Sequence, residues 1–312
     1  MNIIIKINMN KKGEYDIMKI TLLIVLIIVN LTVFFTMKSA IKPNKNILFG
    51  VTLPKEKLKD KETLEVVNMY KKEMNKYIVI SIFLGLLTFK INKTSLQIVY
   101  MLIWTFVVCG VVINLPYKNM NKKLHEIKKK NNWIVEKDED KYWINGYKYY
   151  NENDKSTIVS SRYGYSMTYN LATKRGKIIN YGILIPVSIM VVGICILLII
   201  MDFSNPTINI YQQSNKISID YPMYNYDFKI DEIESVDLVE DININAKTNG
   251  IATNDYDRGN FSVEKYGRSK VYIYKKIKTY IVIKTKDDYV IYNENNKKDT
   301  LKIYNEIKKL LD

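Results

Sequence analysis

Uncharged stretches long enough to cross a lipid bilayer constrain this 312-residue chain more than any other feature. Three of them, residues 20–37, 94–117 and 178–201, contain 18, 24 and 24 residues without a charged side chain. A helix rises about 1.5 Å per residue, so each stretch matches a hydrocarbon core of about 30 Å. A fourth stretch, residues 77–89, has only 13 uncharged residues. It spans if its flanking lysines reach back to the interface or the bilayer thins, and otherwise it is a re-entrant or interfacial segment.

These stretches predict an α-helical membrane bundle of three to four spans. The spans are expected at about residues 18–37, 77–91, 95–116 and 178–202. The first stretch also has an interpretation as a signal peptide, because lysines precede it and Ser39 and Ala40 follow it. Its apolar part is longer than the usual signal core of about 7–15 residues, which favours a span. Residues 1–17 are predicted to be a disordered leader.

The distribution of charge predicts the orientation. The formal net charge is +15, yet residues 203–312 contain 17 basic and 17 acidic residues, so the whole excess lies in residues 1–202. Residues 38–76 hold 10 basic and 5 acidic residues, and residues 118–177 hold 14 and 7. Loops rich in Lys and Arg stay in the cytoplasm. We therefore expect both loops to be cytoplasmic and residues 203–312 to be extracytoplasmic, in a cell-membrane protein without a nucleic-acid partner.

The basic segment 118–177 begins with an amphipathic pattern. Met120, Leu124 and Ile127 form an apolar stripe. The lysines around it are Lys122, Lys123, Lys128, Lys129 and Lys130. A basic amphipathic helix directly after a span is expected to lie on the anionic inner leaflet, which makes the bilayer surface the first predicted partner. The alternative is a solvated linker with a run of charge.

A motif follows in the same segment. Its residues are Trp143, Gly146, Asn151, Asp154, Arg162, Gly164 and Asn170. Together with Phe-Gly-Val-Thr-Leu-Pro at residues 49–54, the motif resembles a family of uncharacterised bacterial multi-pass membrane proteins that share a domain of unknown function. The resemblance covers about residues 46–202, with Glu152 and Ser166 in place of a proline and a glycine of the family pattern. It implies no established activity.

Read from the residues alone, the same motif predicts a turn closed by an ion pair. Asn151 and Asp154 bond the backbone readily in turns, and Gly164 is free to adopt positive φ. We expect Asp154 and Arg162 to pair across a small hairpin. The alternative is a ligand or metal site built from Asn151, Asp154 and Arg162, but one carboxylate is too little for a hard cation.

Residues 203–312 have a different pattern of apolar and polar residues. Apolar and polar residues alternate at 216–221, 271–274, 280–284 and 289–292, which is typical of half-buried antiparallel strands. A helix is expected from about Lys298, and Leu301, Tyr304, Ile307 and Leu311 share one of its faces. This segment resembles the bacterial version of the pleckstrin-homology (PH) fold, a β-barrel closed by one helix. The neutral charge gives no indication of phosphoinositide binding.

The scarcity of reactive side chains argues against an enzyme. The single histidine is His125, and the two cysteines, Cys109 and Cys195, lie inside apolar stretches, so no zinc site, catalytic triad or cofactor is expected. The acidic run Asp138, Glu139 and Asp140 is predicted to be a solvated turn. We expect a non-enzymatic membrane protein of the sensor, immunity or scaffold type, binding an unknown protein partner through its C-terminal domain. The alternative is an accessory subunit of a transporter, because the scarcity of ionisable groups in the spans argues against a self-sufficient transporter but not against an accessory subunit.

Overall fold

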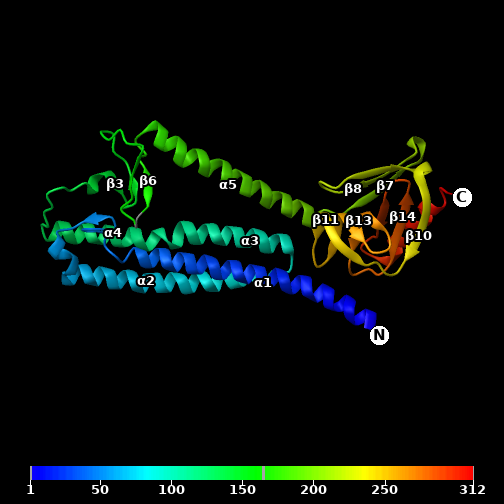
Figure 1. Cartoon of the computed structure of the whole chain (residues 1–312), viewed down its shortest axis with the longest axis horizontal. Coiled ribbons are helices and arrows are strands. Elements are labelled where there is room, and N and C mark those ends of the chain that lie inside the picture. Colours follow the sequence, from blue (N-terminus) through cyan, green and yellow to red (C-terminus); the bar gives the residue numbers. More distant parts are fainter. Residues whose placement is uncertain (1, 164–165, 312) are drawn as a thin grey trace. The chain divides into compact units, whose positions relative to one another are not determined.

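The computed structural model describes residues 2–163 and 166–311, and side chains from Met18 onward. It divides into two compact units, each considered by itself (Figure 1). The helical unit comprises Asp16–Ile196. The sheet unit contains Leu197–Asp312. Gly164 of the predicted turn lies outside the described residues.

Five helices build most of the first part of the chain. They are α1 (Asn2–Ser39), α2 (Lys61–Leu86), α3 (Thr94–Val107), α4 (Asn114–Lys130) and α5 (Lys174–Phe203). A π-helical turn, Val108–Val112, connects α3 to α4, so the two form one long rod. The Asp60 side chain begins α2 by accepting a hydrogen bond from the backbone N–H of Glu62. Helix α1 includes residues 2–17, where a disordered leader was expected. These residues contain no proline, and a helix propagates from an existing one at low cost.

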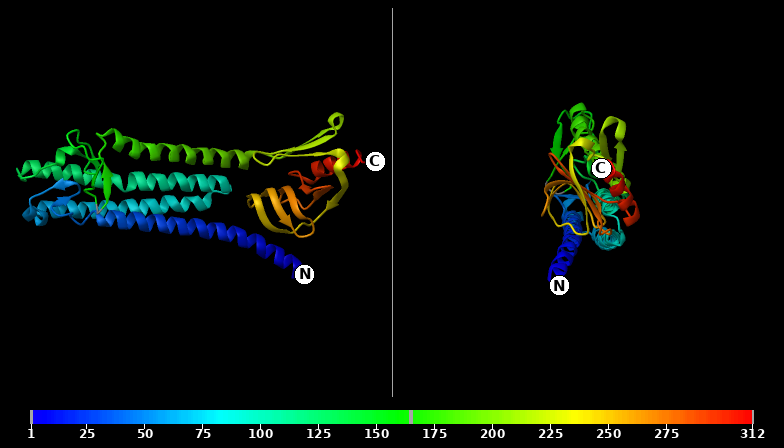
Figure 2. Two further views of the ribbon diagram at one scale, coloured as in Figure 1. Left: turned by 45° about the horizontal axis from the view of Figure 1, so that its top comes forward. Right: turned by 90° about the vertical axis from the view of Figure 1, so that its right-hand side faces the viewer.

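Helices α1, α2 and α3 lie side by side (Figures 1 and 2). A chain of hydrogen bonds joins them: the Trp104 indole N–H donates to the Ser81 carbonyl, and the Ser81 hydroxyl donates to the Asn30 side chain, each at 3.0 Å. Gly85 allows close approach, because a Cβ there would lie 2.8 Å from the Leu26 side chain and 3.1 Å from the Trp104 ring. The short uncharged stretch 77–89 therefore packs directly against the first and third stretches.

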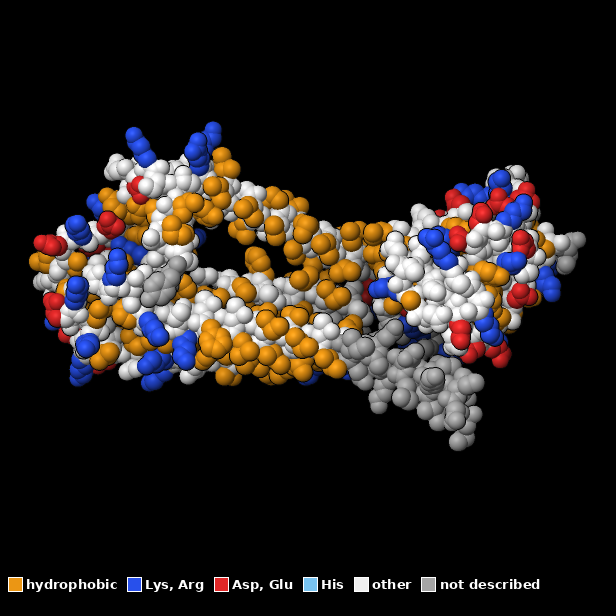
Figure 3. All heavy atoms as spheres, viewed as in Figure 1, with side chains coloured by type: hydrophobic (Ala, Val, Ile, Leu, Met, Phe, Trp, Pro, Cys, Tyr) orange, Lys and Arg blue, Asp and Glu red, His pale blue; other side chains and the backbone are white. Residues whose placement is uncertain are grey.

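Within the described residues, three helical segments are long and apolar enough to cross a membrane: Met18–Ser39, Thr94–Lys130 and Lys174–Phe203. Hydrophobic side chains lie along α5 and along the middle of the other helices, whereas Lys and Arg gather at the end of the helical unit (Figure 3). Helix α5 differs from the others because none of the most apolar part of it is buried by the rest of the described chain. The surface of that apolar part is thus uncovered on all sides.

Three small hairpins complete the helical unit. They pair β1 (Ile47–Leu48) with β2 (Val51–Thr52), β3 (Trp143–Ile144) with β4 (Lys148–Tyr149), and β5 (Ile158–Ser160) with β6 (Met167–Tyr169). The first two hairpins turn through two residues of positive φ, Phe49–Gly50 and Asn145–Gly146. Positive φ at both central residues is the geometry of a tight hairpin turn and explains the glycine in each.

The sheet unit consists of two antiparallel-rich sheets and one helix. The first sheet has the order β7 (Thr207–Tyr211), β8 (Lys216–Asp220), β9 (Tyr226–Lys229). The second has the order β10 (Ile233–Val239), β14 (Tyr280–Thr285), β15 (Tyr289–Tyr292), β13 (Gly267–Tyr274), β12 (Tyr256–Val263), β11 (Ile244–Ala252). In this sheet, as the described residues form it, β13 and β15 pair in parallel and the other neighbouring strands are antiparallel. Side chains of both sheets, including Ile217, Ile219, Ile281 and Ile283, share one core.

The expected closed barrel is not formed. The edge strands β10 and β11 do not pair with each other in the described structure, and both carry register shifts, at Ile233/Ser235 in β10 and at two places in β11. Such bulges bend and twist an edge strand away from a partner. The C-terminal helix α6 (Lys297–Lys308) is present and buries Ile307, but Leu311 follows the helix and is 41% exposed. The expectation that Leu311 lies on the helix with the other three apolar residues is therefore wrong, because α6 ends at Lys308.

Candidate functional site

Asp140 is a buried carboxylate in the helical unit. It lies at the centre of a group of polar residues that we call the Asp140 cluster: Thr52, Lys128, Asp138, Asp140 and Arg162. The Asp140 side chain is 7% exposed. One carboxylate oxygen accepts hydrogen bonds from the Thr52 backbone N–H at 3.0 Å and hydroxyl at 2.7 Å, and from the Arg162 guanidinium. The other accepts from the Lys128 ammonium at 2.8 Å. A single side chain thus joins strand β2, helix α4 and the loop after β5.

The cluster is electrically balanced. Lys128 also donates to Asp138 at 2.6 Å, so two cations meet two carboxylates. Burial acts to raise the pKa of Asp140, but hydrogen bonds from Lys128, Arg162 and Thr52 outweigh it and hold that pKa below its usual range. Asp140 is therefore ionised at neutral pH. The prediction of a solvated acidic turn is wrong for Asp140, because the two cations and the Thr52 donors compensate its desolvation.

His125 lies at the edge of this cluster, with its Nδ1 atom 4.0 Å from Asp140. Burial lowers its pKa, as do Lys128 and Arg162, while Asp140 and Asp138 act in the opposite direction. The net lowering leaves the imidazole neutral at pH 7.

The motif residues converge on the same place. The two tight turns meet so closely that a Cβ on Gly50 would lie 2.3 Å from the Gly146 Cα. The Arg162 guanidinium donates to the Gly50 carbonyl at 2.7 Å and lies over the Trp143 ring at 5.1 Å. Asn121 fixes the first turn by donating to the Phe49 carbonyl at 2.7 Å. Trp143, Gly146 and Arg162 therefore form one structure with residues 49–54, although at least 89 positions separate them.

The remaining motif residues form a second polar group beside β4. The fully buried Asn170 side chain donates to the backbone carbonyls of Asn151 and Asp154, both at 2.8 Å. The Asp154 carboxylate accepts from the Ser156 backbone N–H at 2.8 Å and from the Tyr149 hydroxyl at 3.1 Å. The expected pair of Asp154 with Arg162 is absent among these contacts. Arg162 instead bonds Asp140, while Asp154 is used by its own turn.

The five lysines predicted to lie at the membrane surface differ in their exposure and contacts. Lys122 and Lys129 are exposed, Lys130 bonds Glu62 at 3.1 Å, and the Lys123 ammonium lies 3.0 Å from the Met69 sulfur. Lys128 is buried in the Asp140 cluster. The apolar stripe is also buried: Met120 and Leu124 are 2% and 0% exposed and pack in the core of the helical unit. The stripe therefore packs within the protein, since an amphipathic face serves helix packing equally well, and the contact of the exposed lysines with the inner leaflet stays a prediction.

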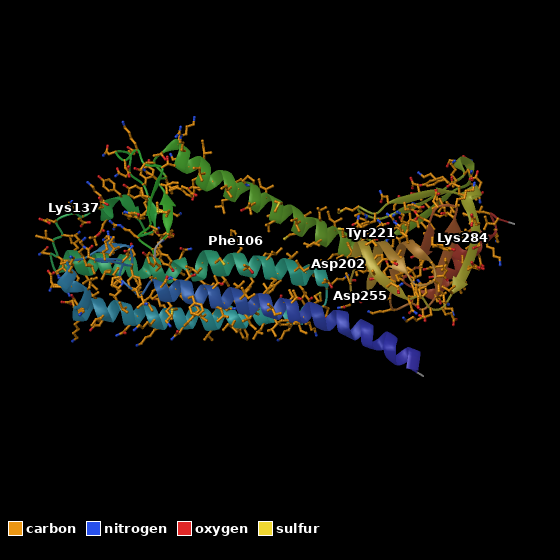
Figure 4. All side chains as sticks on the ribbon, viewed as in Figure 1. Phe106, Lys137, Asp202, Tyr221, Asp255 and Lys284 are labelled. Carbon is orange, nitrogen blue, oxygen red and sulfur yellow. The ribbon has the colours of Figure 1, made fainter. Side chains whose placement is uncertain are left out.

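The sheet unit holds the end of α5 through four side chains, which we call the α5 clamp: Tyr221, Tyr256, Arg258 and Tyr274. Tyr221 donates to the Met201 carbonyl, Tyr256 to the Asp202 carboxylate at 2.8 Å, Arg258 to the Ser204 carbonyl at 2.5 Å, and Tyr274 to the Asn205 side chain at 2.8 Å. Figure 4 shows Asp202 and Tyr221 together where α5 enters the sheet unit.

Arg258 is the centre of the clamp. It is 1% exposed and lies over the rings of Tyr256, Tyr221 and Tyr274 at 3.9, 4.8 and 5.1 Å. The last carbonyls of a helix lack partners within the helix and carry partial negative charge. A guanidinium and a phenol from the domain supply those partners here. None of the clamp residues was predicted from the sequence, because an alternating pattern indicates strands and not which side chains contact a preceding helix.

The polar side chains of the Asp140 cluster and of the α5 clamp join segments of the chain through ion pairs and hydrogen bonds. In the Asp140 cluster each carboxylate is bonded to a cation or to backbone donors. Among the residues that the structure describes, no group of three or more His, Cys, Asp and Glu is arranged to hold a metal ion.

Comparison with known proteins identifies the C-terminal part. The family model for the bacterial PH domain matches residues 208–300. The match begins in β7 and ends in α6, so it covers the strands of both sheets and includes the four clamp residues. No curated protein and no solved structure matches the chain.

Proposed function

We propose that this chain is a non-enzymatic, multi-pass cell-membrane protein of the sensor, immunity or scaffold type that binds a protein partner through its PH-like domain. The observation that carries the proposal is α5. It is 30 residues long, its apolar surface is uncovered, and it enters the PH-like domain with only Ser204–Pro206 between it and β7. An apolar helix without protein cover is what a lipid-facing span requires.

Four spans are supported by the packing of α2. The Leu26 side chain of α1 approaches Gly85, and Asn30 bonds Ser81, so these parts of the two helices lie at the same depth. If α1 crosses the bilayer, residues 77–89 of α2 cross it beside α1. Their 13 residues cover about 20 Å, and Lys76 and Lys90 at the two ends extend toward the interfaces.

With four spans, the distribution of basic residues indicates which segments lie on the cytoplasmic side of the membrane. The Asp140 cluster and its hairpins belong to the cytoplasmic segments 38–76 and 118–177, and the PH-like domain lies outside. A second candidate function, an accessory subunit of a transporter, draws support from the same bare α5 surface, because another subunit's helix fits it as well as lipid does.

Cysteine labelling in intact cells tests this topology. Ser214 and Ser156 are both exposed, the first in the PH-like domain and the second in the basic segment. In a chain whose Cys109 and Cys195 are replaced by alanine, Ser214→Cys should react with a membrane-impermeant thiol reagent. Ser156→Cys should react only after permeabilisation. The opposite pattern would overturn the orientation, and labelling of both in intact cells would overturn the membrane crossing by α5.

The partner is tested by comparing co-purification from the same detergent. A partner bound through the PH-like domain should be retained by the full chain and lost from a chain ending at Asn205. Retention by both would move the partner-binding surface to the helical unit or the spans.

A further inference from the structure

The α5 clamp decides which end of the PH-like domain faces the bilayer. Three loops lie at the clamp end, since each is adjacent in sequence to a clamp residue: residues 221–225 between β8 and β9, 253–255 before Tyr256, and 275–279 after Tyr274. Figure 4 shows Tyr221 and Asp255 close to Asp202 at the end of α5.

The depth of this end follows from the length of the uncharged stretch. Residues 178–201 rise about 36 Å as a helix, which exceeds the hydrocarbon thickness of about 30 Å. The clamp holds Met201–Asn205, so it lies at the level of the lipid headgroups. The connection Ser204–Pro206 is three residues long and reaches only about 10 Å when extended, and Pro206 is buried. The domain therefore has no linker with which to leave the membrane surface.

Two exposed apolar side chains lie at this end. Met223 is 69% exposed at the tip of the 221–225 turn, and Phe203 is 59% exposed at the end of α5. Met223 also has a φ of +67°, a conformation that L-residues rarely adopt, and the backbone bond from Tyr224 N–H to the Tyr221 carbonyl at 3.0 Å holds the turn. A strained turn that presents an apolar side chain outward is unfavourable in water unless something covers the side chain.

The charges of the loops fit a lipid headgroup layer. Lys276 and Lys278 are exposed, Lys276 lies 3.5 Å from Asp255, and Lys275 is paired with Asp257 at 2.8 Å. Two of the three lysines in this loop, Lys275 and Lys276, are therefore paired with carboxylates, and attraction to anionic lipid is weak. An apolar tip at the same end of the domain as two exposed lysines suits the boundary between headgroups and acyl chains.

We propose that the clamp end of the PH-like domain is a lipid-binding surface, which seats on the leaflet around α5 and inserts Met223 into the acyl boundary. The proposal rests on the proposed span by α5 and adds a contact that the span alone does not require. The binding surface is the end of the domain that contains the clamp, and its ligand is the lipid surface.

Fluorescence quenching on the full chain in proteoliposomes of mixed zwitterionic and anionic lipid tests it. Three proteins each carry one labelled cysteine: Cys195 within the span, Met223→Cys, and Ser214→Cys at the opposite end of β8 as the control. We expect a lipid-borne quencher to remove most of the fluorescence at 195 and 223, and an aqueous quencher to act on 214 alone. Quenching at 223 only from water would overturn the proposal while the span stands. Quenching at 195 from water would overturn the span itself, and with it the proposal.

A second measurement separates insertion from mere proximity. With a label at Lys278→Cys, Met223→Asp should increase access of the aqueous quencher to position 278, whereas Met223→Leu should leave it unchanged. Equal access in all three backgrounds would show that Met223 does not hold the domain on the lipid. Protection at 278 that disappears when the protein is diluted into excess lipid would assign the surface to a second copy of the chain and overturn the proposal.

Discussion

Replacing Asp140 by asparagine should destabilise the helical unit strongly, although the shape of the side chain is kept. The change removes the negative charge that faces Lys128 and Arg162, whose side chains are 10% and 5% exposed. Removing one member of a buried ion pair typically costs about 3–5 kcal/mol, because the remaining charge stays buried. Lys128 keeps Asp138, and Arg162 keeps the Gly50 carbonyl and the Trp143 ring. We therefore expect the lower end, about 3 kcal/mol.

The assay is thermal unfolding of the detergent-solubilised chain, followed by tryptophan fluorescence. All three tryptophans, at positions 104, 133 and 143, belong to the helical unit, so the signal reports that unit. A unit of this size shifts its melting temperature by roughly 2–4 °C per kcal/mol, which gives a decrease of about 6–12 °C for Asp140→Asn.

Asp138→Asn is the matched control. It removes the same charge from the same lysine, but the Asp138 side chain is 40% exposed, and pairs of that kind contribute about 0–1 kcal/mol. If Asp140→Asn and Asp138→Asn lower the melting temperature equally, the Asp140 cluster does not hold the helical unit together as argued.

Three further predictions concern other parts of the fold. Gly50→Ala should lower the melting temperature of the helical unit and Gly110→Ala should not, because a Cβ at Gly50 meets Gly146 at 2.3 Å whereas Gly110 has nothing within 4 Å; equal effects would refute the close contact of the two turns. Ile307→Asp should destabilise the sheet unit by a few kcal/mol in thermal unfolding followed by near-ultraviolet circular dichroism, and Leu311→Asp should not, since only Ile307 is buried. Because the pKa of His125 is lowered in the folded state, its neutral form contributes stability above about pH 6.5 that is lost as pH falls, and His125→Gln should remove that pH dependence of the melting temperature.

The sequence predicted well what depends on local pattern. The uncharged stretches are helical, and the alternating segments after residue 203 are strands followed by one helix, in a part of the chain that matches the bacterial PH domain. Periodicity and length determine such elements directly. Barrel closure was not predictable in the same way, because it depends on whether two edge strands far apart in the sequence pair with each other.

The polar contacts escaped prediction because they connect distant positions. Asp140 bonds Thr52, which is 88 residues away, and Arg162, which is 22 residues away. A carboxylate in a charged run is interpreted as solvated unless its partners are known. The packing of the stripe of Met120, Leu124 and Ile127 escaped prediction for a related reason, since the same spacing serves a membrane surface or a neighbouring helix. In the structure the stripe packs on a neighbouring helix, because Val66 and Tyr70 of α2 belong to the same buried core as Met120 and Leu124.

The α5 clamp gives the most discriminating prediction for the sheet unit, because its central residue is a fully buried cation. Arg258→Met keeps the length of the side chain and removes the stacking on three tyrosines and the bond to the Ser204 carbonyl. A desolvated cation–π contact contributes about 2 kcal/mol and a hydrogen bond from a charged group about 1.5–3 kcal/mol, so a loss of about 3–4 kcal/mol is expected after relief of the desolvation cost. Arg268→Met, on the exposed part of β13, is the control and should be nearly neutral. A spin label at Thr207 should become more mobile in Arg258→Met alone, because the end of α5 is no longer held. If neither the mobility of the label nor the stability of the sheet unit changes, Arg258 does not hold the end of α5. The clamp would then not determine which end of the domain faces the bilayer.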